Sequence, residues 1–165
     1  MKKMLFFILL VTAFHIKAWS QDGPHHFAVS LGPELGFPSH SIYTIGGGGS
    51  LKAEVAVSTR ASITATAGYS SFGYKNIGGT RQSTNFIPLK AGLRYKGAGA
   101  YLEGELGEAM KTGINKQNLF AYSIGPGFIF KLNEMQSIDL GFRYENWSQN
   151  TLQQIAVRVA FRLGW

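Results

Sequence analysis

The sequence predicts an all-β protein, an eight-stranded antiparallel up-and-down transmembrane β-barrel. Apolar and polar residues alternate with period two over most of the chain. The alternating segments are 10–14 residues long, whereas strands of soluble sheets usually have ~5–6 residues and membrane-crossing strands need about 9–11. Within each segment the charged residues share one face, as expected if the other face meets lipid.

The first twenty residues have the organisation of a secretory signal peptide. Two lysines precede a mostly apolar run at 4–14, which is too short to span a bilayer as a helix, and small residues surround a cleavage point at 18–20. We therefore expect a cleaved signal peptide at 1–20 and a barrel domain at 21–165.

Charge and cysteine content exclude several classes of function. Without Lys2, Lys3 and Lys17 the formal charge of +7 falls to +4, which is too mild to indicate a nucleic-acid partner. The chain has no cysteine, so disulfides, cysteine-ligated metals and thiol nucleophiles are absent.

The strands are expected at 27–37, 46–58, 61–73, 85–95, 98–107, 119–131, 137–146 and 152–165. The first carries Glu34, and the second carries Lys52 and Glu54 on one face. The second and third strands have many Ala and Gly residues on the proposed outer face, and the third has no charged residue, so the facing of these two strands is the least clear of the eight. On the fourth, Lys90 and Arg94 again share a face.

The later strands show the alternation more clearly. Glu103 and Glu105 share a face of the fifth strand, and Lys131 ends the sixth. The seventh sets Ile138, Leu140, Phe142 and Tyr144 against Asp139, Arg143 and Glu145. The apolar face of the eighth carries Ile155, Val157, Val159, Phe161, Leu163 and Trp165, with Arg158 and Arg162 opposite.

The connections are expected to alternate between long and short, as in barrels with one outer and one periplasmic rim. Long ones are expected at 38–45, 74–84 and 108–118, and short ones at 59–60, 96–97 and 132–136. Pro33, Pro88 and Pro126 interrupt strands of a sheet without free edges, so we expect β-bulges there.

The charged face is predicted to fill the interior, because eight strands enclose a lumen just wide enough for side chains. Buried charges need partners, and seven basic residues nearly balance six acidic ones, which favours a plugged, paired lumen over an ion-selective channel. The predicted lumen charge network comprises Glu34, Lys52, Glu54, Lys90, Arg94, Glu103, Glu105, Lys131, Asp139, Arg143, Glu145, Arg158 and Arg162.

Aromatic residues near strand ends are predicted to form two interfacial girdles on the outer surface. They are Tyr43, Tyr69, Tyr74, Phe86, Tyr95, Tyr101, Tyr144, Trp147 and Trp165.

Three sequence blocks carry a family resemblance: FIPLKAGLRY at 86–95, YLEGELG at 101–107 and VAFRLGW at 159–165. With them, the chain resembles small bacterial outer-membrane β-barrels of the OmpA/OmpX-like type, in particular the single-domain Bacteroidetes-type versions. The resemblance implies an outer-membrane location in a Gram-negative cell and a structural or surface-interaction role without enzymatic activity, cofactor or metal. It also implies contact with outer-membrane lipid and lipopolysaccharide, and recognition by the assembly machinery. The residues of that assembly signal are Val157, Val159, Phe161, Leu163 and Trp165.

Two other functions fit the residues. A secreted, soluble lipocalin-like barrel would bind an apolar ligand and turn its charged face outward. An outer-membrane lipid-modifying enzyme would use Ser39 or Ser41 with one of His25, His26 and His40, although no orienting carboxylate stands beside them.

Overall fold

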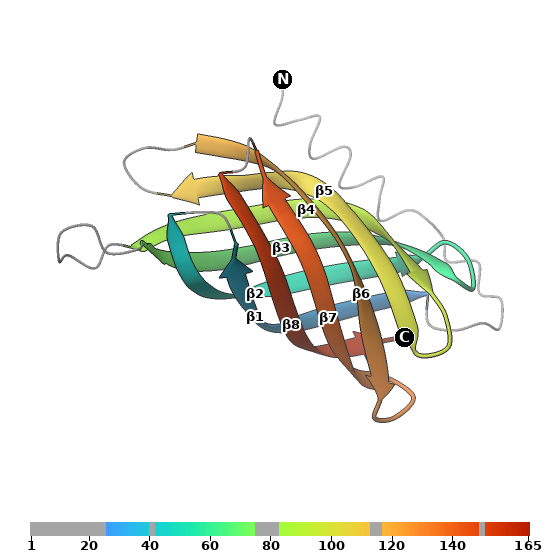
Figure 1. Ribbon diagram of the computed structural model, residues 1–165. Coiled ribbons are helices and arrows are strands. Elements are labelled where there is room, and N and C mark those ends of the chain that lie inside the picture. Colours follow the sequence, from blue (N-terminus) through green and yellow to red (C-terminus); the bar gives the residue numbers. More distant parts are fainter. Residues whose placement is uncertain (1–25, 40–41, 75–82, 113–116, 149–150) are drawn as a thin grey trace, which may run out of the picture.

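The computed structural model describes residues 26–39, 42–74, 83–112, 117–148 and 151–165. They form one closed antiparallel barrel in which each strand pairs with the next along the chain and β8 returns to β1 (Figure 1). The strands are β1 Phe27–Pro38, β2 Tyr43–Ala56, β3 Ala61–Tyr74, β4 Ser83–Lys96, β5 Ala100–Thr112, β6 Gln117–Lys131, β7 Gln136–Trp147 and β8 Leu152–Gly164. The described part of the chain contains no helix that is long and apolar enough to cross a membrane.

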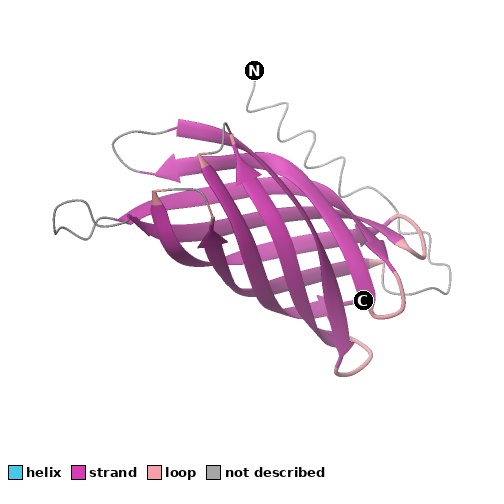
Figure 2. Cartoon of the chain, viewed as in Figure 1, coloured by secondary structure: helices cyan, strands magenta, loops and turns pink. Residues whose placement is uncertain are grey.

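The predicted fold class is confirmed, but the strands extend further than the sequence indicated. At one end of the barrel, the loop end, the connections shrink to 39–42, 75–82, 113–116 and 148–151. At the other, the turn end, they are 57–60, 97–99 and 132–135 (Figure 2). The expected alternation of long and short connections is therefore largely wrong, because β2, β4, β5 and β6 continue into the segments assigned to loops.

The apolar side chains point out of the barrel. Leu31, Leu93 and Leu106 are 64%, 66% and 61% exposed on the outer surface. Arg94 and Asp139 are 1% and 0% exposed in the interior. The soluble lipocalin-like alternative is wrong, since it requires the opposite facing, and the exterior instead matches a hydrocarbon environment.

The prolines interrupt hydrogen bonding without producing bulges. Pro33 keeps its pairing with Gly49 of β2 but has no partner in β8, and the register resumes unchanged beyond it. The gaps at Pro88 and Pro126 likewise leave the register unshifted. Each proline loses ladder bonds on one side, and the barrel tolerates these gaps. The expected bulges at the prolines are therefore wrong; the register shifts instead in β2, between Tyr43 and Gly46.

The two terminal strands close the barrel at the turn end. The backbone amide of Phe27 donates to the carbonyl of Trp165 at 3.1 Å, and the amide of Trp165 donates back at 3.0 Å. Their rings meet edge to face with centroids 5.2 Å apart. The last residue of the chain therefore helps to close the sheet.

A charge introduced on the outer face tests this facing. Val157 lies on β8 between Leu35 and Phe142, two exposed apolar neighbours on the outer surface. We expect Val157→Arg to lower the free energy of unfolding in lipid by about 2–4 kcal/mol, measured by urea titration in vesicles. Glu134→Arg, in a turn outside the strands, is the control; an equal loss in both variants would contradict the assigned facing.

Candidate functional site in the lumen

The charged side chains of the interior form a closed ring of ion pairs with alternating sign. Each member lies within 4 Å of the next, and the ring contains as many acidic as basic groups. In order it runs through Glu34, Arg143, Glu145, Lys90, Glu105, Lys52, Glu103, Arg94, Asp139 and Arg158, and then returns to Glu34.

Arg94 is the most connected member of the ring. Its guanidinium contacts Glu103 at 2.5 Å, Asp139 at 3.0 Å and Glu54 at 3.1 Å. The same group lies 3.8 Å from the ring centroid of Tyr101, whose hydroxyl donates to Asp139 at 2.5 Å. Because the planar guanidinium presents several donors at fixed angles, one arginine connects β2, β4, β5 and β7.

Lys90 and Lys52 each contact two carboxylates of the ring. Lys90 lies 2.7 Å from Glu145 and 3.3 Å from Glu105, and Lys52 lies 3.2 Å from Glu105. β3 and β6, which contribute no member to the ring, supply hydroxyl groups to Glu105: Thr66 of β3 donates at 2.5 Å and Ser123 of β6 at 3.3 Å.

Glu34 closes the ring on the side of β1. Arg143 lies 2.7 Å away and Arg158 3.5 Å away, and the Ser50 hydroxyl donates to Glu34 at 2.5 Å. Arg158 also donates to the Ser30 hydroxyl at 3.0 Å. Glu34 thus has polar partners from strands on both sides of it and across the lumen.

The structure brings together all but one of the charged residues predicted for the interior. Arg162 joins the ring through Glu54 at 3.4 Å. Lys131 does not join it: this residue ends β6 and is exposed, and it forms no ion pair with the residues described. Lys131 is on the inward-facing side of β6, since it pairs with buried Ser137. The barrel ends at this level, however, so solvent reaches the Lys131 side chain.

Sequence reasoning missed Lys96, which was assigned to a short connection. It is the last residue of β4, and its ammonium contacts Glu54. Its spacing of two and six residues from Arg94 and Lys90 places it on their face, so the alternation would have identified it.

Above the charged ring, the loop end of the lumen is filled by an aromatic cap, which we define as Tyr43, Phe72, Phe86 and Trp147. These side chains are at most 4% exposed. The Phe86 and Trp147 centroids are 4.9 Å apart, and Phe72 lies 5.9 Å from Trp147 and 6.0 Å from Phe86. Leu119 and Leu152 pack against the cap.

Two glycines make room for these large groups in a narrow lumen. A Cβ atom at Gly46 would lie 2.2 Å from the Phe72 ring, and one at Gly127 would lie 2.1 Å from the Tyr101 ring. Neither distance is sterically possible. Gly46, the first residue of the glycine run at 46–49 within β2, therefore has a packing role.

The predicted aromatic girdles are partly wrong. Tyr43, Phe86, Tyr101 and Trp147 point into the lumen, and Tyr74 packs against the cap. Residues that do face outward, with exposures between 41% and 58%, are Tyr69, Tyr95, Tyr144 and Trp165. Phe37, Phe120, Tyr122, Phe128, Phe130 and Phe161 are also exposed on the outer surface.

Other candidate residues lie at the barrel surface or outside the described part of the chain. The residues proposed as an assembly signal, Val157 to Trp165 at every second position, all have outer-face alternation. Ser39 donates to the Gln153 carbonyl at 3.4 Å and His26 is exposed. His25, His40, Ser41 and the predicted signal peptide fall outside the described residues. Among those described, no cluster of three or more metal-ligating side chains occurs.

Several solved structures share this architecture. Neisserial surface protein A is 14% identical with a TM-score of 0.60, covering 87% of this chain and 100% of that one. The outer membrane protein OprG from Pseudomonas aeruginosa is 12% identical with a TM-score of 0.58, covering 88% and 97%. Ail, the attachment invasion locus protein of Yersinia pestis, in complex with the heparin analogue sucrose octasulfate, is 15% identical with a TM-score of 0.56, covering 86% and 98%. No curated protein matches the chain.

The fold is that of small outer-membrane barrels, and the exposed apolar exterior of this chain requires the same lipid environment. The eight-stranded up-and-down architecture, which the sequence resemblance to OmpA/OmpX-like barrels implied, is therefore confirmed. A family model described as "Putative MetA-pathway of phenol degradation" matches residues 7–162, and the chain belongs to that family.

Proposed function

We propose that this protein is a plugged outer-membrane barrel with a structural or surface-interaction role and no catalytic activity. The closed ring of alternating ion pairs carries the proposal, because it crosses the lumen and engages charged groups from β1, β2, β4, β5, β7 and β8. An ion path through the barrel would have to separate these pairs.

The packing of the interior supports the same role. One void beside Tyr101 and Arg143 has a volume of about 20 Å³, and another beside Phe72 and Gln154 about 10 Å³. Each is of the size that holds a single water molecule. The aromatic cap adds a second, apolar barrier on the loop side of the ring, so a solute would meet two different obstructions.

The charge balance also distinguishes this lumen from a selective pore. Ion-selective pores carry rings of side chains of one sign. Here the signs alternate, and Lys96 takes the place that the sequence gave to Lys131, so that basic groups exceed acidic ones by one. The side chains neutralise each other, and no single ionic species is favoured.

Surface interaction is the second part of the proposal. In the sequence, Lys75, Arg81 and Lys116 fall between strands and outside the described residues, and Lys111 lies near the end of β5. This positive charge suits the anionic groups of lipopolysaccharide, and the structural neighbour Ail was solved with a sulfated saccharide analogue. The apolar residues that are exposed at every second position of β8, followed by Trp165, suit recognition by the outer-membrane assembly machinery.

Removing the Arg94 guanidinium, the most connected group of the ring, tests whether the network stabilises the barrel. Arg94→Ala leaves Glu54, Glu103 and Asp139 buried without their shared cation. We expect a loss of unfolding free energy of about 3–5 kcal/mol, seen as a lower temperature for the heat-induced shift in electrophoretic mobility. Arg60→Ala, in an exposed turn, is the control and should leave this temperature unchanged. A barrel that tolerates both changes equally has no stabilising network.

Planar-bilayer recording tests the plug itself. Purified protein should insert without steady conductance, because the ring and the cap obstruct the lumen at separate levels. Insertion is verified independently by protease protection of the strands. A large, stable conductance from correctly inserted protein would refute the plugged lumen and leave the fold unaffected.

A further inference from the structure

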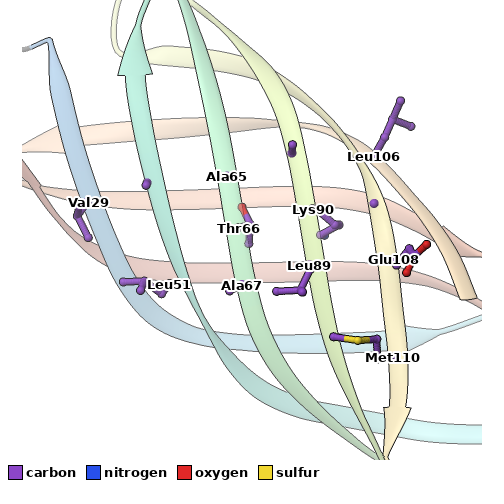
Figure 3. A pocket seen from close by; sticks show the side chains of 13 residues that line it. Val29, Leu51, Ala65, Thr66, Ala67, Leu89, Lys90, Leu106, Glu108 and Met110 are labelled. Atoms are coloured by element: carbon purple, nitrogen blue, oxygen red, sulfur yellow. The ribbon is translucent and has the colours of Figure 1, made fainter. Parts of the chain in front are cut away.

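The outer surface of the barrel is hollowed by an apolar groove across β1 to β5. Its volume is about 630 Å³, and it is open to the surroundings of the barrel along its length. Its lining includes the small side chains of Ala65, Ala67 and Ala91, which we call the alanine floor. The longer side chains of Leu51, Leu89, Leu106 and Met110 line it as well (Figure 3). The small residues that weakened the sequence assignment of this region thus form a depression in the lipid-facing wall.

A single carboxylate stands at the edge of this groove. Glu108 is exposed on the outer face of β5, paired across the sheet with Leu89 and Phe120. Sequence reasoning placed Glu108 in a loop and left the outer face uncharged; that expectation is wrong, because β5 continues to Thr112. Among the described strand residues, Glu108 is the one charged side chain with outer-face alternation.

The level of Glu108 in the membrane follows from the strand register. Leu106, two residues nearer the turn end, pairs with Tyr122, an exposed outer aromatic. Tyrosines on such surfaces lie at the headgroup level, so Glu108 lies at that level or just beyond it. From there the groove crosses the tilted strands toward Val29, near the turn end of β1. An extended acyl chain would follow this direction, because barrel strands tilt by about 35–45°.

Within the described residues, little compensates the negative charge of the Glu108 carboxylate. The Asn118 amide donates a long hydrogen bond of 3.4 Å to Glu108, and no ion pair within the described residues includes this carboxylate. An exposed carboxylate at the headgroup level attracts a cationic group with the modest strength of a surface ion pair. We propose that the groove binds one membrane lipid with a primary ammonium headgroup, its acyl chain on the alanine floor and its ammonium donating to Glu108.

Native mass spectrometry of the detergent-released barrel tests this site. The protein is mixed with palmitoyl-oleoyl phosphatidylethanolamine or with phosphatidylcholine of the same chains, which carries no N–H donor. We expect the wild-type barrel to retain the ethanolamine lipid about fivefold better, the upper range of an exposed ion pair. Glu108→Gln should abolish this preference, whereas Glu134→Gln, in an exposed turn, should preserve it.

A second pair of variants tests the groove. Ala67→Phe fills its floor and should remove retention of both lipids, while Ala100→Phe, on the outer face at the turn end of β5, should not. The heat-induced mobility shift confirms that each variant is folded. Equal retention of the two lipids by the wild type, or a preference that survives Glu108→Gln, would overturn the proposal. A dimer that Ala67→Phe dissociates would also overturn it, by identifying the groove as an interface between copies.

Discussion

The need to compensate charge inside a closed lumen governs this structure. Water does not fill an eight-stranded barrel, so every inward carboxylate must meet a cation from another strand. Glu34 meets Arg143 and Arg158, Glu145 meets Lys90, and the pairs join into one ring. Such ion pairs fix the relative positions of the strands that carry them, because a one-residue slip would move a whole face from the lumen into lipid. The network therefore specifies register as well as occupying space.

The same constraint explains why the fold was predictable from sequence. A side chain two residues along a strand returns to the same face, so the shared alternation of Lys90 and Arg94, or of Asp139 and Glu145, identifies the interior directly. Strand ends were less predictable: the register of β5 with β4 and β6 extends it through Glu108 and Ala109, although Gly107 and the polar residues beyond it are typical of loops. Hydrogen bonding to two neighbouring strands overrides local propensity there.

The facing of several aromatic side chains was predicted wrongly from the sequence. Proximity to strand ends suggested lipid interfaces, yet Phe86, Tyr101 and Trp147 have the alternation of the charged residues on their own strands and follow it inward. Alternation was the better guide, because burial decides side-chain facing all along a strand. Tyr43 is different. Tyr43 lies an odd number of residues from the inward-facing Lys52, which predicts that its side chain faces outward. The register shift between Tyr43 and Gly46 turns the side chain into the lumen instead. A bulge of this kind depends on pairing between strands and has no local sequence signal.

Two of the glycines make room for large groups in a narrow lumen. The chain has 21 glycines among 165 residues. The Phe72 and Tyr101 rings lie over the neighbouring strand, where the residue paired with each is a glycine, Gly46 and Gly127 respectively. A side chain at Gly127 would displace the Tyr101 ring, and with it the hydrogen bond that its hydroxyl donates to Asp139 beside the Arg94 guanidinium. Glycine on one strand therefore positions charge on others. Composition, alternation and ion pairing all follow from the same requirement, which is to fill a small closed space with groups that satisfy one another.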